Sequence, residues 1–102
     1  MNNILSLLGL CKKSGRMICG TDMVIDSMQK KKIFFIFIAS DSTEATIDKI
    51  EKKAYFYQVP INKSFDTLSL NQALGTNNFK VIGISDLGFS KKFIELSKVE
   101  RE

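Results

Sequence analysis

A chain of 102 residues with 44% hydrophobic and 25% charged side chains has the size and composition of one globular domain over residues 1–102, and its net charge of +4 is only mildly basic. The chain has no histidine and no glycine-rich phosphate loop, so neither an enzyme, a metal site nor a cofactor is expected. The longest apolar run, residues 33–39, is too short to cross a membrane, and the first residues lack a signal-peptide pattern, so a cytoplasmic protein without membrane contact is expected.

Helix-type and strand-type segments alternate along the whole chain. Apolar spacing and cap residues predict helices from residue 2 or 3 to 13, from about 22 to 30, from the 41–44 loop to about 57, from 64 or 66 to 74, and from the 86–88 turn to about 99. Short β-branched or aromatic runs predict strands over residues 16–19, 33–39, 59–61 and 80–85. This alternation predicts an α/β fold, a three-layer α/β/α sandwich with a small, mostly buried mixed sheet.

The predicted core is centred on the 33–39 strand, whose apolar run shows no alternation and so indicates burial on both faces. Its three phenylalanines, Phe34, Phe35 and Phe37, are therefore expected in the core rather than on a surface that stacks with bases. Cys11 and Cys19 fit neither a CxxC pair nor a metal-ligand spacing, so both are expected to be reduced, buried thiols.

Residues 11–28 form the most informative segment of the chain. A basic cluster opens it and consists of Lys12, Lys13 and Arg16. A short strand follows, Gly20 turns the chain, and Thr21 is placed to cap the second helix. A helix start of this kind presents free backbone N–H groups and the positive end of the helix dipole beside basic side chains. The segment therefore favours an anionic ligand, of which nucleic acid is the obvious large one.

Two acids on the second helix, Asp22 and Asp26, leave the interpretation open. Acids near a helix N-terminus complement the dipole whatever the function, so these two either stabilise the helix or contact a ligand. The basic run at residues 30–32 has the same two interpretations, a solvated surface or a contact for an anion.

Four motifs carry a resemblance to a known family: LLGLCKKSGRMICG near the start, IASDST after the central strand, LNQALG, and VIGISDLGFSKK near the end. In this order and spacing the chain resembles the L7Ae/L30e ribosomal-protein superfamily of RNA binders, most closely its bacterial YlxQ-like branch, over nearly its whole length. The resemblance implies a single α/β/α sandwich, no catalytic activity, and binding to kink-turn RNA, a bent internal loop built on tandem sheared G·A pairs.

The resemblance also implies an RNA-binding site of two parts. The helix after the glycine would enter the groove at the kink, and the loop before the last strand would touch a loop nucleotide. The first part comprises Gly20, Thr21, Asp22, Met23, Asp26 and Lys30. The second comprises Gly75, Thr76, Asn77, Asn78 and Phe79. Lys12, Lys13, Arg16 and Lys30 would neutralise phosphates.

The chain departs from the family at three positions that usually read the RNA: family binders carry Asn or Lys at Asp22, Glu or Gln at Met23, and Lys at Asp26. Two functions are therefore expected as alternatives. The first is a ribosome- or translation-associated protein that binds structured RNA, an element of rRNA or mRNA, as a monomer. The second is a protein–protein interaction module that kept the fold and lost the RNA-reading residues.

Overall fold

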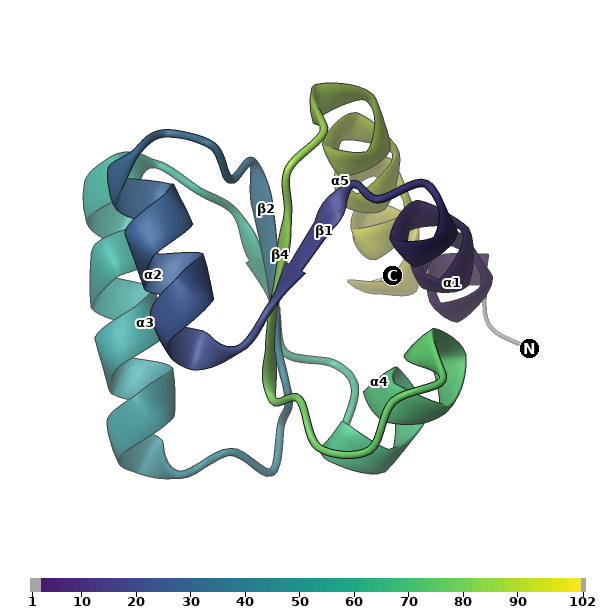
Figure 1. The fold of residues 1–102 in the computed structure, drawn as a ribbon, viewed down its shortest axis with the longest axis horizontal. Coiled ribbons are helices and arrows are strands. Elements are labelled where there is room, and N and C mark those ends of the chain that lie inside the picture. Colours follow the sequence, from purple (N-terminus) through teal and green to yellow (C-terminus); the bar gives the residue numbers. More distant parts are fainter. Residues whose placement is uncertain (1–2, 102) are drawn as a thin grey trace.

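A mixed β-sheet lies between two layers of helices in the computed structural model, which describes residues 3–101 (Figure 1). The helices in this part of the chain are α1 (Asn3–Lys13), α2 (Thr21–Gln29), α3 (Glu44–Tyr57), α4 (Thr67–Leu74) and α5 (Leu87–Arg101). The strands are β1 (Met17–Cys19), β2 (Phe35–Ile38), β3 (Ile61–Asn62) and β4 (Val81–Ile84), in the spatial order β1-β4-β2-β3. β4 is antiparallel to both β1 and β2, whereas β2 and β3 are parallel.

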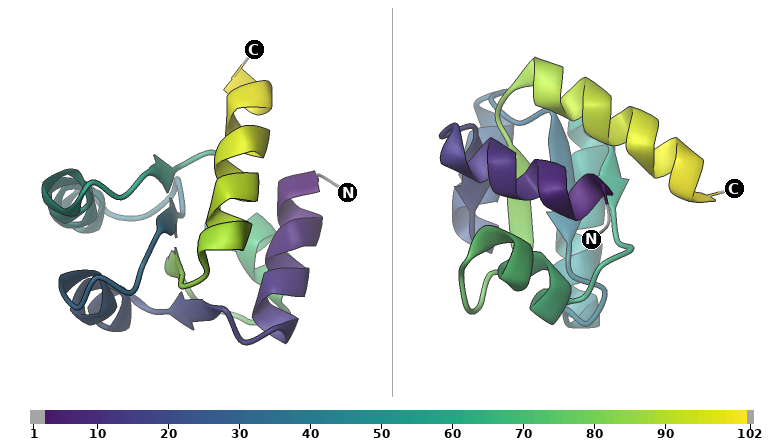
Figure 2. Two further views of the ribbon diagram at one scale, coloured as in Figure 1. Left: turned by 90° about the horizontal axis from the view of Figure 1, so that it is seen from above. Right: turned by 90° about the vertical axis from the view of Figure 1, so that its right-hand side faces the viewer.

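The two faces of the sheet are covered by different helices. α2 and α3 cover one face, and α1, α4 and α5 cover the other, with α1 lying between α5 and α4 (Figure 2). Side chains along β2 alternate between the two layers: Phe35 and Phe37 join the core under α1, α4 and α5, while Ile36 and Ile38 join the core under α2 and α3. The predicted three-layer sandwich is thereby confirmed.

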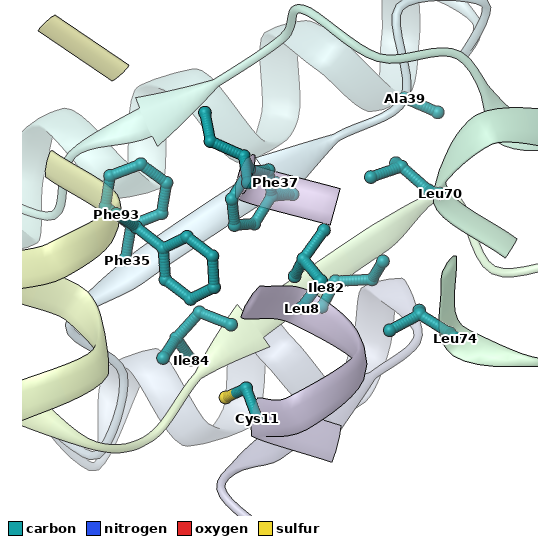
Figure 3. Packing of buried hydrophobic residues seen from close by; sticks show 11 residues of the cluster. Leu8, Cys11, Phe35, Phe37, Ala39, Leu70, Leu74, Ile82, Ile84 and Phe93 are labelled. Carbon is teal, nitrogen blue, oxygen red and sulfur yellow. The ribbon is translucent and has the colours of Figure 1, made fainter. Parts of the chain in front are cut away.

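Aromatic packing fills the larger core. The rings of Phe35 and Phe37 have centroids 5.1 Å apart, and Phe93 of α5 meets Phe37 edge-on at 5.0 Å (Figure 3). Edge-to-face and tilted contacts of this kind add to the stabilisation from burial. Phe34, the first of the three expected core phenylalanines, is only half-buried.

The ends of the elements follow the local signals of the sequence. Thr43 and Asp66 accept hydrogen bonds from main-chain amides at the starts of α3 and α4. Gly75 ends α4 in the left-handed conformation, at φ 70°. Pro60 precedes β3, which is an edge strand, as proline requires. The alternative helix start at residue 2 lies outside the described residues.

Two local predictions are wrong. Thr21 does not cap α2, because it is already the first helical residue; Gly20 occupies the N-cap position, and its carbonyl oxygen accepts the first helical hydrogen bond from the Val24 N–H. Cys19 is only half-buried, because it lies at the end of β1, the short edge strand opposite β3.

Candidate nucleic-acid interface

Gly20 sets the conformation at the start of α2. Its φ of 104° and ψ of 141° lie in a region that residues with a Cβ rarely adopt. Its N–H donates to the Val81 carbonyl oxygen at 2.9 Å, and no side chain caps the helix. A Cβ built at this position would have no atom within 4 Å, so the space above the backbone is open. The helix thus presents uncapped first-turn amides and its positive dipole end to a ligand that approaches closely.

The loop of residues 75–80 lies directly beside this helix start. β1 pairs with β4 so that Cys19 faces Ile82, and the Gly20–Val81 hydrogen bond extends that pairing to the first residue of β4, directly after the loop. On the other side, the Ala39 N–H donates to the Lys80 carbonyl oxygen at 2.8 Å. The two parts of the predicted site, far apart in sequence, therefore meet where β1 ends and β4 begins, at the lower ends of the strands in Figure 1. Below, the two edges of the sheet are the two ends of its strands, lower and upper in that view.

A buried asparagine, Asn71, fixes the conformation of this loop. Its Nδ2 donates to the carbonyl oxygens of Thr67 and Phe79 at 2.7 and 2.8 Å. Its Oδ1 accepts from the Thr76 hydroxyl at 2.6 Å and from the Phe79 N–H at 2.9 Å. With 4% exposure and four hydrogen bonds, the side chain acts as a template for the loop backbone. Asn71 was not among the predicted site residues, although a polar residue between the buried Leu70 and Leu74 of α4 was a signal for it.

The fixed loop directs several side chains into solvent. Asn77, Asn78 and Phe79 are exposed, whereas Thr76 is half-buried against Asn71. Side chains held on a rigid backbone bind with less loss of conformational entropy than those on a mobile loop. The loop is therefore suited to make polar and apolar contacts with an unstacked base.

Lys80 adds a cation at the same edge that the sequence interpretation missed. Its Nζ donates to the Thr67 hydroxyl at 2.9 Å. The Thr67 hydroxyl and N–H donate in turn to one Asp41 carboxylate oxygen, at 2.6 and 2.9 Å. These hydrogen bonds, with the nearby Lys80 charge, hold the pKa of Asp41 below its usual value. The network ties the loop after β2 to the loop before β4.

Lys12 and Lys13 adjoin this region through a groove that reaches Gly75. Both are exposed in the last turn of α1, and they line a groove between α1 and α4 together with Gly75. The charge of Lys12 also reaches Cys19, where it partly opposes the rise in the thiol pKa caused by burial. The α2 N-terminus, the 75–80 loop and this groove are together called here the loop-edge surface.

Arg16 and Lys30 lie at the opposite edge of the sheet. The Arg16 carbonyl oxygen accepts from the Ser85 N–H at the far end of β1, about 13 Å along the strand from Gly20. Lys30 follows the C-terminus of α2, about 14 Å from Thr21 along the helix. Its ammonium pairs with Asp26 at 3.0 Å, so each charge is partly compensated by the other.

The outer face of α2 connects the two edges. Val24 and Met28 are buried against the sheet, whereas Asp22, Asp26 and Met23 face solvent. Met23 is 61% exposed, so its side chain lies outside the core. The N-terminal half of this face therefore combines uncapped amides with a free carboxylate and an apolar side chain.

The thiols are unsuited to nucleophilic chemistry. Burial, with smaller effects from Asp86 and Cys19, raises the pKa of Cys11 to about 12, and burial also raises the pKa of Cys19. Both are therefore protonated at neutral pH. Within residues 3–98, no three potential metal ligands lie together. No helix in the described part of the chain is long and apolar enough to cross a membrane.

Comparison with known proteins decides the family. Residues 2–94 match the ribosomal protein L7Ae/L30e/S12e/Gadd45 family. The chain belongs to this family. It is 35% identical over 92 residues to RNA-binding protein YlxQ of Enterococcus faecium, covering 90% of this chain and 88% of that one. It is 28% identical over 90 residues to RNA-binding protein YlxQ of Bacillus subtilis (strain 168), covering 88% and 90%. Both relatives are named as RNA-binding proteins, and the family assignment agrees with the prediction that this chain is not an enzyme.

Solved structures agree with the fold. A Bacillus halodurans C protein of unknown function superposes with a TM-score of 0.92 at 30% identity, covering 94% of this chain and 97% of that one. The Giardia lamblia 15.5kD RNA binding protein superposes with a TM-score of 0.80 at 18% identity, covering 96% and 85%. The second likeness concerns the fold alone.

Proposed function

We propose that this protein binds structured RNA of the kink-turn type through its loop-edge surface. The observation that supports this best is the adjacency of the uncapped α2 N-terminus and the 75–80 loop, which the Gly20–Val81 hydrogen bond brings together. The names of the YlxQ relatives and the family membership point the same way.

Each part of the surface has a distinct role in this proposal. The backbone at Gly20 and the hydroxyl of Thr21 contact the RNA where it bends, since glycine permits close approach. Asp22 accepts a hydrogen bond from a guanine N–H, and Lys12 and Lys13 neutralise phosphates. The loop side chains, Asn77, Asn78 and Phe79, contact a nucleotide displaced from the stack.

The proposal assigns a smaller contribution to Arg16 and Lys30. They lie at the other edge of the sheet, so only an RNA that extends along the outer face of α2 reaches them. Lys30 is also partly neutralised by Asp26. We further propose that the protein acts as a cytoplasmic monomer on an rRNA or mRNA element, in association with the ribosome or with translation.

The proposal is tested by titrating a kink-turn duplex into the protein at about 50 and 200 mM salt, beside the same duplex with its G·A pairs replaced by Watson–Crick pairs. Tight binding to the intact kink-turn alone is expected. The double variant Lys12→Glu/Lys13→Glu should bind more weakly, with a salt slope reduced by about two. The charge-matched control Lys49→Glu/Lys52→Glu, on the exposed side of α3, should change little.

Two outcomes would count against the proposal. Equal, salt-sensitive binding to both duplexes would indicate a basic surface without kink-turn specificity. No binding to either would favour a second candidate function, a protein–protein module that kept the fold. The observation behind that candidate is the exposed Asp22–Met23 pair, which stands where the family's usual RNA-reading residues are found. A protein partner recovered after nuclease treatment would then be expected.

A further inference from the structure

A pocket of about 620 Å³ lies between the ends of α2 and α3 and the start of α5. Figure 1 shows these three helix ends at the upper edge of the sheet, opposite Gly20. Its volume is within the roughly 300–1,000 Å³ of typical ligand-binding clefts. The floor and walls are mostly apolar: Met28 and Ile33 are buried, and Val59 and Ile94 are half-buried. Gln58 and Ser90 are the uncharged polar side chains of the lining. We call this the three-helix pocket.

Large apolar side chains continue from the pocket to the protein surface. Phe56 is 75% exposed and Leu87 is 53% exposed, and both line the pocket. The Phe56 ring is held edge-on against Tyr57, with centroids 4.9 Å apart. A fixed, exposed aromatic beside an apolar cleft is the arrangement that dominates the energetics of protein–protein interfaces.

The charge around the pocket is of one sign. Lys31 and Lys91 are its only ionisable lining residues apart from Tyr57, and no carboxylate lines it in the described part of the chain. Neither lysine forms an ion pair with an acid whose side chain the structure describes. An occupant that matches this surface has an apolar group for the cleft and carboxylates beside it.

We propose that the three-helix pocket binds an acidic, amphipathic peptide segment of another protein. One large apolar side chain of the segment inserts between Phe56 and Leu87, and flanking carboxylates pair with Lys31 and Lys91. A second copy of this chain fits poorly, because the net charge of +4 brings like charges together. The phosphates of nucleic acid fit poorly as well, because they gain nothing from the apolar floor.

The pocket is separate from the proposed RNA surface. Thr21 and the pocket residue Met28 are seven residues apart on α2, a separation of about 11 Å along the helix. The pocket therefore shares no lining residue with the loop-edge surface. The peptide proposal does not depend on the RNA proposal.

The first test uses two pools of synthetic peptides and amide chemical shifts of the ¹⁵N-labelled protein. One pool carries a central Leu, Ile, Phe or Trp flanked by Asp and Glu, and the control pool has Lys in place of each acid. The acidic pool should shift the amides of Lys31, Val59 and Leu87 and leave residues 20–23 and 75–79 unchanged. No shifts, or equal shifts with both pools, would overturn the proposal.

Matched variants locate the contact in the second test. Phe56→Ser should weaken binding of the acidic pool about ten-fold or more, whereas Tyr55→Ser should not. Tyr55 is the neighbouring residue, is 83% exposed, and does not line the pocket, so both variants should fold alike. Equal effects of the two substitutions would overturn the proposal.

Charge reversal gives an independent comparison on α5. Lys91→Glu should weaken binding of the acidic pool and make it less salt-sensitive. Lys92 does not line the pocket and pairs with Glu95, so Lys92→Glu should leave binding of the acidic pool unchanged. If Lys91→Glu instead weakens RNA binding and leaves peptide binding unchanged, the pocket belongs to an RNA surface and the proposal is wrong.

Discussion

The Asn71 side chain gives the sharpest prediction about the loop-edge surface. Asn71→Ala removes four hydrogen bonds of 2.6–2.9 Å from a side chain that is 4% exposed. At about 1 kcal/mol net for each bond, the loss is about 4 kcal/mol. The better helix propensity of alanine returns about 0.6 kcal/mol, and water reaches some of the freed groups on the exposed loop. We therefore expect the free energy of unfolding to fall by about 2–3 kcal/mol.

The variant should still be folded at room temperature, because small domains are stable by about 5–15 kcal/mol. Its RNA affinity should fall about ten-fold or more, since the RNA must now order the loop backbone. Urea denaturation gives the first quantity, and titration with kink-turn RNA gives the second. Gln72→Ala, the exposed neighbour on the same helix, is the control for stability and should leave the free energy of unfolding unchanged.

Two results would refute this reasoning. A loss of stability no larger than that of the Gln72→Ala control would mean that the Asn71 hydrogen bonds do not hold the loop. A loss of stability with unchanged RNA affinity would mean that the loop lies outside the RNA-binding surface.

Three further predictions concern single residues. Gly20→Ala should lower the free energy of unfolding by about 1–3 kcal/mol, because alanine is strained at a backbone φ of 104° even though its methyl group would meet no neighbouring atom. Unchanged stability in urea would argue against this backbone conformation. Burial raises the pKa of Cys11 from 9.0 in the unfolded chain to about 12 in the folded protein, so the free energy of unfolding should fall as pH rises through that interval. The fall should be less steep in Cys11→Ala, and parallel pH profiles of the two proteins would exclude this cause. Ser90 is wholly buried, and its hydroxyl has no hydrogen-bond partner among the described residues, so Ser90→Ala should leave the melting temperature unchanged or higher; a clear decrease would reveal a hydroxyl contact that stabilises the fold.

Most of the fold was predictable because its signals are local. The 33–39 apolar run, the cap residues Thr43 and Asp66, and the stop at Gly75 each act within a few residues of where they stand. The Thr21 prediction was wrong because the start of α2 depends on a distant contact. Val81 fixes the Gly20 N–H, and this contact takes the N-cap position away from Thr21.

The candidate site was predictable only in part, since its geometry depends on how distant segments pack. The adjacency of Gly20 and the 75–80 loop follows from β1 pairing with β4, which no local pattern encodes. The same pairing places Arg16 about 13 Å along the strand from Gly20, at the other end of β1. Asn71 and Lys80 were missed because their roles come from hydrogen bonds to residues eight or more positions away, Phe79 and Thr67, and local sequence patterns do not reveal such contacts.

The central claim is that the α2 N-terminus and the 75–80 loop form one RNA-binding surface. The most direct measurement is photocrosslinking of a 4-thiouridine-substituted kink-turn RNA to the protein, with the crosslinked peptides identified by mass spectrometry. The account predicts crosslinks within residues 20–26 and 75–80 of the same complex. Crosslinks confined to residues 30–34 and 56–59 at the opposite edge would contradict it.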